Sequence, residues 1–292
     1  GAACDLRTSS YVKKPLLFVG HDGIQAGSEV VLLEVIKWFY HHTDRRIKTL
    51  LLSPGPLANQ YAEYSDCYVL PDYSVDCNED LAAFLKADFE FCYINTVVAG
   101  QLFRMLSDCD ITLKGDVIAH VHEMEKVIRE NEESFALLKE RACHYISASP
   151  ASSRDMVEHF GIAPEDITTV PAFIRIIDPE GSRLNELRSE ARTELGIPED
   201  AFVVAGCGTV YWRKGPDIFL DCAKAICAEQ GDVHFVWIGP GPDLDATIDS
   251  IPEELKERIH FVGGKDHASQ LLACADLFFL SSREDPFPLV VM

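Results

Sequence analysis

Residues 202–217 read FVVAGCGTVYWRKGPD, a short apolar run followed by glycines, two cations and a Gly-Pro pair. The apolar run has the length of a strand, and the Gly-Pro pair opens a segment of helical period that extends to Gln230. Continuous rather than alternating apolarity predicts a strand that is buried on both faces, as in a parallel sheet. This stretch therefore predicts a strand–loop–helix unit of an α/β protein.

The same pattern recurs along the chain in two sets of apolar runs. Helical segments lie between the runs, among them residues 28–40 and 123–141. The first set of runs lies at residues 16–19, 49–53, 67–70, 89–94, 117–121 and 145–148, and the second at 202–205, 235–238, 259–262 and 277–280. Strands that alternate with helices form parallel sheets covered by helices, and the two sets predict two such sheets.

The boundary between the two predicted domains lies near residues 170–174. A polar stretch with proline and glycine follows at residues 178–181, and a helix rich in Arg and Glu is predicted from 182 to 195. We therefore predict two Rossmann-like domains, residues 1–174 and 175–292. In such folds ligands bind at the carboxyl ends of the strands, so we expect a cleft where these ends of the two sheets meet.

The charge of the chain restricts its partners. Lys and Arg number 26 and Asp and Glu 47, which gives 26 − 47 = −21. A field of this sign repels nucleic acid, and the densest basic clusters are only pairs, Lys13-Lys14 and Arg45-Arg46. We therefore expect no nucleic-acid partner.

The ten cysteines are scattered, and no two form a C-x-x-C pair. Several lie inside apolar runs, such as Cys92 and Cys207. This distribution predicts buried free thiols in a reducing cytosol rather than disulfides or a zinc site. No apolar stretch approaches the roughly 18 residues of a membrane span.

The loop after the first strand, residues 20–29, reads GHDGIQAGSE and leads into a helix. Gly27 would let a ligand approach closely, and Ser28 could cap the helix. Backbone N–H groups and the helix dipole could then bind phosphate or an acceptor. The alternative is a plain strand-to-helix turn. The segment is not G-x-G-x-x-G, so a dinucleotide site is not indicated.

A second candidate is His120-Val121-His122-Glu123, at the end of a strand. Strand alternation places His120 and His122 on one side of the sheet. An imidazole here could hydrogen-bond a sugar hydroxyl. Two histidines and a glutamate could also ligate zinc, but no third ligand elsewhere in the sequence stands out. A structural strand end is the remaining alternative.

Three further segments, in residues 206–292, contain charged residues or turns that could contact a ligand. Arg213 and Lys214 lie at a glycine-rich helix start, where they could hold a diphosphate; a solvated charge pair is the alternative. Residues 237–242 predict a strand that ends in a turn near a nucleotide. In residues 281–292, carboxylates could hydrogen-bond sugar hydroxyls, unless this is only an acidic surface loop.

Taken together, these segments resemble the retaining GT-B glycosyltransferases called glycosyltransferase family 4 or group 1. The resemblance extends from Leu16 to Met292. It depends on the order and spacing of its motifs. The strongest are RKGPD at 213–217, IGPGP at 238–242, and ACADL at 273–277 leading into SSREDPFPL at 281–289, with ISAS at 146–149, Val170-Pro171 and HVHE at 120–123 in support.

The resemblance implies roles for particular residues. His122 would meet the donor sugar. Asp285 would be the first acid of the family's E-x7-E motif, with Glu284 beside it as the competing assignment. Lys214 would contact the donor diphosphate, helped by Arg213, and Gly27 would line the diphosphate or acceptor side of the cleft. Further contacts to the nucleotide or its sugar would come from Gly208, Gly239, Phe287, Pro288 and Leu289.

Two departures accompany the resemblance. The arginine that usually lies five residues before the lysine is Thr209 here, which weakens the expected anion clamp. The second acid of the motif would follow Met292 directly, so we expect the chain to be a fragment whose donor site is incomplete.

The implied activity is that of a retaining hexosyltransferase that uses a nucleotide diphosphate sugar and a saccharide or lipid-linked acceptor. The chain has no D-x-D at a strand end, so we predict metal independence and no cofactor. Polysaccharide or glycolipid biosynthesis in the cytoplasm is the expected setting, with a peripheral contact at the inner face of the membrane. The alternatives are a non-catalytic nucleotide-sugar-binding module and a GT-B sugar epimerase or phosphorylase; a Rossmann dehydrogenase is more distant.

Overall fold

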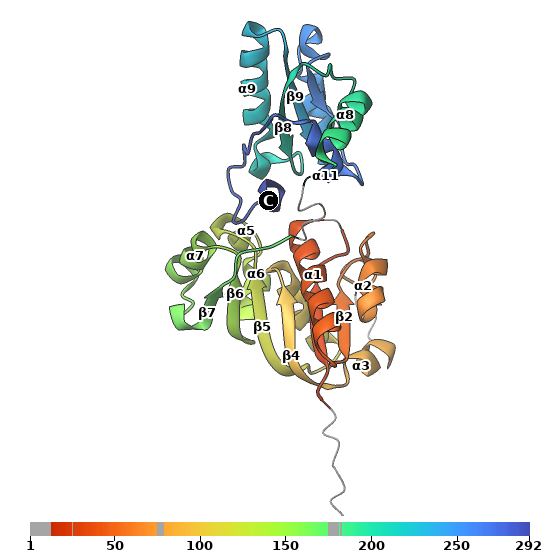
Figure 1. Ribbon diagram of the computed structural model, residues 1–292. Coiled ribbons are helices and arrows are strands. Elements are labelled where there is room, and N and C mark those ends of the chain that lie inside the picture. The colour runs from red at the N-terminus through yellow and green to blue at the C-terminus, as the bar shows by residue number, and fades with distance from the viewer. Residues whose placement is uncertain (1–12, 25, 75–78, 175–180, 182) are drawn as a thin grey trace, which may run out of the picture. The chain divides into compact units, whose positions relative to one another are not determined.

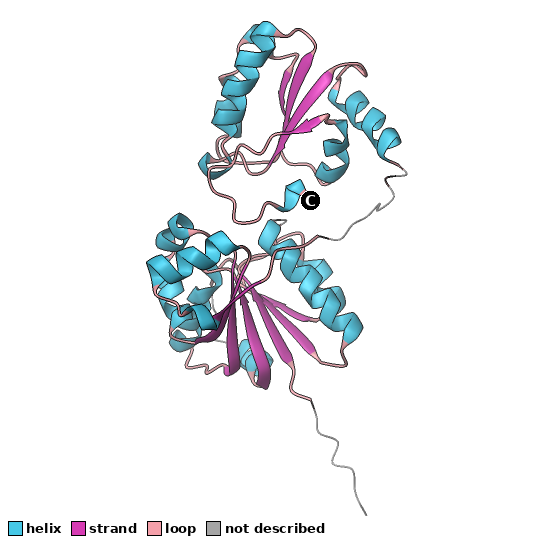
Figure 2. Ribbon diagram, turned by 60° about the vertical axis from the view of Figure 1, so that its left-hand side comes forward, coloured by secondary structure: helices cyan, strands magenta, loops and turns pink. Residues whose placement is uncertain are grey.

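The computed structural model describes residues 13–24, 26–74, 79–174, 181 and 183–292. The chain divides into two compact units, residues 1–174 and 175–292 (Figure 1). Each unit contains one parallel sheet with helices on both of its faces (Figure 2). Of the polar stretch at 178–181, residues 178–180 lie outside the described part of the chain.

The first unit is built on a seven-stranded parallel sheet with the order β3-β2-β1-β4-β5-β6-β7. The strand order therefore reverses between β1 and β4, and the carboxyl ends of these strands form the topological switch point where α/β proteins bind ligands. The strands are β1 Leu16–Gly20, β2 Ile47–Leu51, β3 Asp66–Val69, β4 Asp88–Asn95, β5 Lys114–Val121, β6 Ala142–Ser147 and β7 Ile167–Thr169.

Two hydrophobic cores cover the faces of this sheet. Because neighbouring residues of a strand point to opposite faces, Phe18 packs with Leu32 and Tyr61 on one side, while Leu17 packs with Phe135 on the other. The helices are α1 Gly27–His42 and α2 Ala58–Tyr64 on the first face, and α3 Glu79–Leu85, α4 Leu102–Asp108, α5 Glu125–Glu130, α6 Glu132–Lys139 and α7 Pro150–Phe160 on the second.

The second unit has a four-stranded parallel sheet with the order β10-β9-β8-β11. Its switch point lies between β8 and β11. The strands are β8 Phe202–Cys207, β9 Val233–Ile238, β10 Ile259–Phe261 and β11 Leu277–Phe278, and the helices are α8 Leu184–Leu195, α9 Pro216–Glu229, α10 Leu244–Asp249 and α11 Ala268–Leu271.

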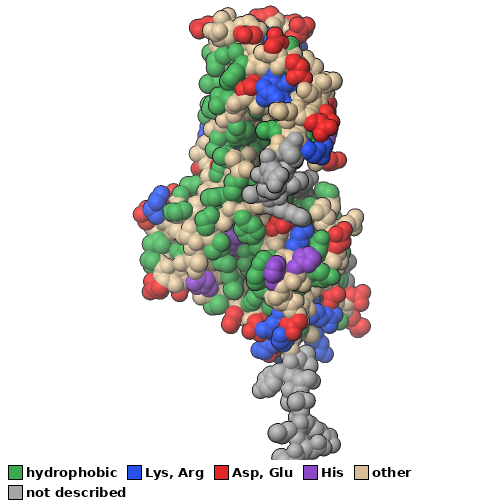
Figure 3. All heavy atoms as spheres, viewed as in Figure 1, with side chains coloured by type: hydrophobic (Ala, Val, Ile, Leu, Met, Phe, Trp, Pro, Cys, Tyr) green, Lys and Arg blue, Asp and Glu red, His purple; other side chains and the backbone are tan. Residues whose placement is uncertain are grey.

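Helices also cover both faces of the second sheet. Phe219 of α9 packs with Trp237 on one face, and Ala191 of α8 packs with Leu271 of α11 on the other. Hydrophobic side chains also gather on the outer side of α9 (Figure 3), where Ile226 is 40% exposed.

The predicted α/β class and the two parallel sheets are confirmed, and each of the ten predicted apolar runs overlaps a strand. Strand β7 was not predicted, because two of its three residues are threonines and it is not an apolar run. The predicted helical segment 123–141 is two helices, which are separated at Asn131, whose φ and ψ are −119° and 32°.

Two local predictions were wrong. The residue that caps α1 is Ala26 rather than Ser28, whose hydroxyl instead donates to Glu29 Oε2 at 2.6 Å. Among the described cysteines seven are free thiols, but Cys109 is disulfide-bonded. The prediction of free thiols therefore fails at Cys109, because scattered positions in a sequence do not show which cysteines the fold brings together.

Candidate functional site

Polar side chains gather at the switch point of the first sheet, where β1, β4 and β5 end. His21 follows β1, Asn95 is the last residue of β4, and His122 follows β5. The first turn of α1 adds Ser28 and Glu29. These residues come from separate strand–helix units, and the parallel topology brings them to one edge of the sheet.

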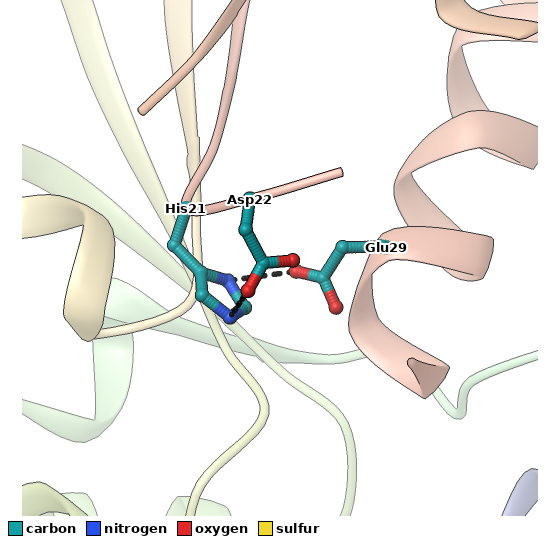
Figure 4. Close-up of side chains that lie close together, drawn as sticks. All are labelled: His21, Asp22 and Glu29. Carbon is teal, nitrogen blue, oxygen red and sulfur yellow. Dashed lines mark ion pairs between the residues drawn. The ribbon is translucent and has the colours of Figure 1, made fainter. Parts of the chain in front are cut away.

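The two ring nitrogens of His21 each face a carboxylate (Figure 4). Its Nδ1 is 2.7 Å from Glu29 Oε1, and its Nε2 is 3.1 Å from Asp22 Oδ2. Burial would lower the pKa of His21, but the hydrogen bonds to Asp22 and Glu29 outweigh burial and raise it to about 10. His21 is therefore an imidazolium at neutral pH, and it forms ion pairs with both carboxylates.

The same three side chains are the one group of His, Cys, Asp and Glu in the described residues that could hold a metal ion, with ligand atoms within 4.8 Å of one another. In this arrangement the His21 ring already pairs with an oxygen of each carboxylate, and its single positive charge offsets one of their two negative charges. Of the residues considered from the sequence, His120, His122 and Glu123 do not form such a group within the described chain.

His120 and His122 lie on one side of β5, as strand alternation predicted, with ring centroids 3.8 Å apart. Burial lowers the pKa of His120 to about 3. Its Nδ1 hydrogen-bonds the Tyr93 hydroxyl, while its buried Nε2 has no partner among the described residues. His120 is thus a buried, neutral residue whose ring lies next to that of His122.

His122 is held from two directions. Its Nε2 is 2.9 Å from Asn95 Oδ1, and its backbone N–H donates to Glu123 Oε2 at 2.9 Å. Burial, followed by the neighbouring His120 and the charge of His21, holds the pKa of His122 well below its usual value. Burial also raises the pKa of Glu123 to about 7, although backbone N–H groups partly oppose this shift.

The link between His122 and the start of α1 is Asn95. Its Nδ2 donates to the Ser28 carbonyl at 3.1 Å. Gly27, the other residue predicted in this unit, is the exposed first residue of α1 and the chain neighbour of Ser28. The structure therefore brings the Gly27 segment and His122 together through a side chain that the sequence analysis did not single out.

Backbone strain lies at the same place. Thr96, directly after Asn95, is buried and has a φ of 73°, a conformation that costs a β-branched residue energy. Its N–H donates to the His120 carbonyl at 2.9 Å. Such strain persists where surrounding contacts fix the chain, and it is common at functional sites.

In the second unit, the loops after β8 and β11 meet at the switch point. Lys214 forms an ion pair with Asp285, and their side chains are only 16% and 9% exposed. Ser281 Oγ donates to the Lys214 carbonyl at 3.1 Å. The structure thus joins two residues that are 71 positions apart and that the sequence analysis named separately.

Arg213 and Glu284 belong to the same junction. Arg213 Nη1 donates to the Glu284 carbonyl at 2.9 Å, and its own carbonyl accepts from the Arg283 N–H at 2.8 Å. Glu284 Oε2 is buried without a hydrogen-bond partner among the described residues. Arg213 is therefore engaged with the loop that carries the acids.

Gly208 and Gly239 lie against each other beside this junction. A Cβ on Gly239, whose φ is 149°, would be 2.1 Å from the Gly208 carbonyl oxygen. A Cβ on Gly208, with a φ of 146°, would be 3.2 Å from the Lys214 side chain. Glycine is needed at both positions for the backbone to approach this closely.

The remaining predicted residues are Phe287, Pro288 and Leu289. They are half-buried and lead into a short 3-10 turn, in which the Val291 N–H donates to the Pro288 carbonyl at 3.1 Å. Their role at a nucleotide stays a prediction.

The sequence analysis missed His21, Glu29, Asn95 and Arg283. A signal existed for Asn95, because it is a polar residue at the end of a strongly apolar run. Arg283 holds Asp217, at the start of α9, through two hydrogen bonds of 2.8 and 2.6 Å. His21 lies in a quoted segment, but only the fold shows that its ring meets Glu29.

Two parallel α/β units, each with polar groups at the switch point of its sheet, agree with the predicted GT-B architecture. Residues 201–292 match the family model described as glycosyl transferases group 1. Over this stretch the chain is similar to the group 1 glycosyltransferases.

Curated relatives are similar to parts of the chain. The alpha-galactosylglucosyldiacylglycerol synthase of Streptococcus pneumoniae (strain ATCC BAA-255 / R6) is 29% identical over 51% of this chain and 40% of its own length. The D-inositol 3-phosphate glycosyltransferase of Corynebacterium aurimucosum is 26% identical over 73% of this chain and 55% of its own. The chain thus spans about half the length of these relatives.

Solved structures share the fold over nearly the whole chain. Anabaena Alr3699/HepE in complex with UDP-glucose has a TM-score of 0.74 at 19% identity, covering 95% of this chain and 77% of that one. WaaG, a glycosyltransferase involved in lipopolysaccharide biosynthesis, has a TM-score of 0.68 at 12% identity, covering 94% and 77%. At these identities the likeness concerns the fold.

Within the described residues, no helix combines the length and the apolar character that crossing a membrane requires.

Proposed function

We propose that the chain carries the donor-binding machinery of a retaining hexosyltransferase, which moves a sugar from a nucleotide diphosphate sugar to a hydroxyl of a saccharide or lipid-linked acceptor. Residues 175–292 bind the donor in this proposal, and residues 1–174 lie on the acceptor side. The observation that carries the proposal is the Lys214–Asp285 pair at the switch point of the second sheet.

This pair combines the two kinds of group that a nucleotide sugar requires. A lysine ammonium is a compact charge suited to a diphosphate, and a carboxylate accepts hydrogen bonds from sugar hydroxyls. The start of α9 follows directly, with Gly215 in a left-handed conformation and Pro216 as its first residue. N–H groups at such a helix start favour phosphate.

The chemistry that follows is charge stabilisation. Negative charge grows on the departing diphosphate, and Lys214, assisted by Arg213, would stabilise it more strongly as it grows. Gly208 and Gly239 would let the nucleotide approach the backbone. The sequence prediction that no metal takes part stays part of this proposal.

The names of similar proteins support a role in polysaccharide or glycolipid biosynthesis. The synthase of Streptococcus pneumoniae is named for a glycolipid product, and WaaG is described as acting in lipopolysaccharide biosynthesis. We propose polysaccharide or glycolipid assembly in the cytoplasm, with a peripheral contact at the inner face of the membrane. UDP-glucose is the first donor to test, since it is bound in the similar Alr3699/HepE structure.

Calorimetric titration with UDP and UDP-glucose tests the donor site. Lys214→Met should weaken the binding of both by about tenfold or more, because it removes a charged contact worth roughly 1.5–3 kcal/mol. Lys256→Met is the matched control, since Lys256 is half-exposed and pairs with Glu253 on the surface. Equal affinity of wild type and Lys214→Met would contradict the assignment.

Product analysis separates the alternatives. A glycosyltransferase releases UDP from UDP-glucose when an acceptor is present. An epimerase would instead convert the sugar without releasing UDP, and a binding module would do neither. Detection of an epimeric nucleotide sugar in the absence of acceptor would favour the epimerase over our proposal.

A further inference from the structure

Asn95 is a fully buried amide at the carboxyl end of β4, with none of its surface exposed. Both ends of its side chain are engaged: Nδ2 with the Ser28 carbonyl at 3.1 Å, and Oδ1 with His122 Nε2 at 2.9 Å. A buried polar side chain is retained where its hydrogen bonds are satisfied, and here they join α1 to the residue after β5.

These two contacts fix the orientation of the amide. A backbone carbonyl only accepts hydrogen bonds, so the group that faces Ser28 must be the NH2 group of Asn95. The amide oxygen then faces His122, and this oxygen also only accepts. His122 Nε2 must therefore carry a proton and donate it.

The charge of His122 completes the assignment. Its surroundings hold its pKa well below the usual value, so the ring is neutral and has a single ring proton. That proton is on Nε2, and Nδ1 is left with a lone pair. The nearby imidazolium of His21 opposes a second proton on this ring.

We propose that Asn95 is a positioning residue that holds His122 in the Nε2–H tautomer, so that His122 Nδ1 accepts a hydrogen bond from a substrate hydroxyl. The hydroxyl in question is one of the sugar donor, and this part rests on the proposed function. The same amide links the start of α1 to His122, so the positions of Gly27 and of the His122 imidazole are fixed relative to each other.

The tautomer decides whether His122 Nδ1 donates or accepts a hydrogen bond. A neutral imidazole in the other tautomer would donate from Nδ1 and would favour an acceptor such as a phosphate oxygen or a carbonyl. In the Nε2–H tautomer it favours a group that can donate, which every sugar hydroxyl can. Asn95 thus determines which kind of ligand atom His122 recognises.

Nitrogen NMR of the complete chain with 15N-labelled histidine tests the tautomer directly. The signals of His122 are assigned by their loss in His122→Gln. We expect one protonated nitrogen, Nε2, one bare nitrogen, Nδ1, and no protonation across the neutral pH range. A His122 ring protonated at Nδ1 in the wild type would overturn the proposal without any variant.

Two substitutions at Asn95 test its control over the ring. Asn95→Leu keeps a similar volume but offers no acceptor, so His122 should show a mixture of tautomers. Asn95→Asp places a charge beside Nε2, so His122 should become protonated near neutral pH. Asn59→Asp, on the exposed surface of α2, is the matched charge control and should leave the His122 signals unchanged. Unchanged His122 signals in both Asn95 variants would refute the positioning role.

Turnover of UDP-glucose separates this inference from the proposed function. We expect Asn95→Leu to lower kcat/KM by about tenfold, as for loss of one oriented hydrogen bond. Asn95→Asp should add a pH dependence near neutrality that the wild type lacks. Suppose that the wild type gives the expected NMR spectrum of His122 but does not turn over UDP-glucose. This result would overturn the sugar-binding role and the proposed function, while the assignment of the tautomer would stand.

Discussion

At the scale of single residues, the charge state of a few buried side chains governs the first unit. His21 is held as a cation by Asp22 and Glu29, while His120 and His122, close to it, are held neutral by burial. Three histidines at one edge of a sheet thus have fixed and different charges. The sequence shows the three residues but not their surroundings, and therefore could not predict this division.

The pKa of His21 predicts a specific pH dependence of stability. The folded chain keeps the His21 proton up to about pH 10, whereas the free side chain has a pKa of 6.5. Between these values the folded state binds more protons than the unfolded state, so the free energy of unfolding falls as pH rises. The contribution, of order a few kcal/mol, is fully present below pH 6.5.

Urea unfolding at a series of pH values measures this effect. His21→Gln should flatten the alkaline decline and lower stability most at pH 6.5 and below. His120, with a pKa of about 3, is neutral in both states throughout the alkaline range and does not interfere there. A decline of equal slope in His21→Gln and the wild type would show that another group causes it.

At the scale of elements, the donor unit depends on close contact between two strand–loop turns. Gly239→Ala would place a methyl group 2.1 Å from the Gly208 carbonyl oxygen, which is too close for unbonded atoms. The backbone φ of 149° at this position is also unfavourable for alanine. We expect a loss of roughly 3 kcal/mol or more in stability, together with weakened UDP binding.

Gly231→Ala is the matched control for this change. Gly231 lies just after α9, and a Cβ there would meet nothing within 4 Å. Its effect should stay within about 0.5 kcal/mol, as for an ordinary surface substitution. Thermal unfolding of both variants measures the difference. Similar small changes in Tm for Gly239→Ala and Gly231→Ala would contradict the argument that the backbone at Gly239 approaches Gly208 too closely for a side chain.

The elements also show what a sequence can and cannot reveal. Apolar runs such as 16–19 and 202–205 predicted strands because burial on both faces leaves a continuous hydrophobic signal. The threonine-containing β7 leaves no such signal. Lys214 and Asp285 were each recognised within local motifs, whereas their pairing depends on the parallel order of β8 and β11, which no local pattern records.

At the scale of the whole molecule, each unit has its own sheet and its own hydrophobic cores. The first unit, with seven strands and two covered faces, contains what a domain of its size requires. We therefore predict that residues 1–174 fold alone, with a cooperative thermal transition and a helical circular dichroism spectrum. A fragment that gives no cooperative transition would show that residues 175–292 are needed to complete its core.

The pairing of Lys214 with Asp285 has a consequence for how an anionic ligand enters the second unit. The lysine is not bare in the structure, because a carboxylate of the same chain neutralises it. Under the proposed function, binding is then an exchange of one anion for another at a fixed cation. Because the Lys214–Asp285 pair carries no net charge, it exerts little long-range attraction on an incoming anion. Selectivity would come from how well the incoming diphosphate outcompetes a tethered carboxylate, and simple anions such as chloride would compete poorly for the same place.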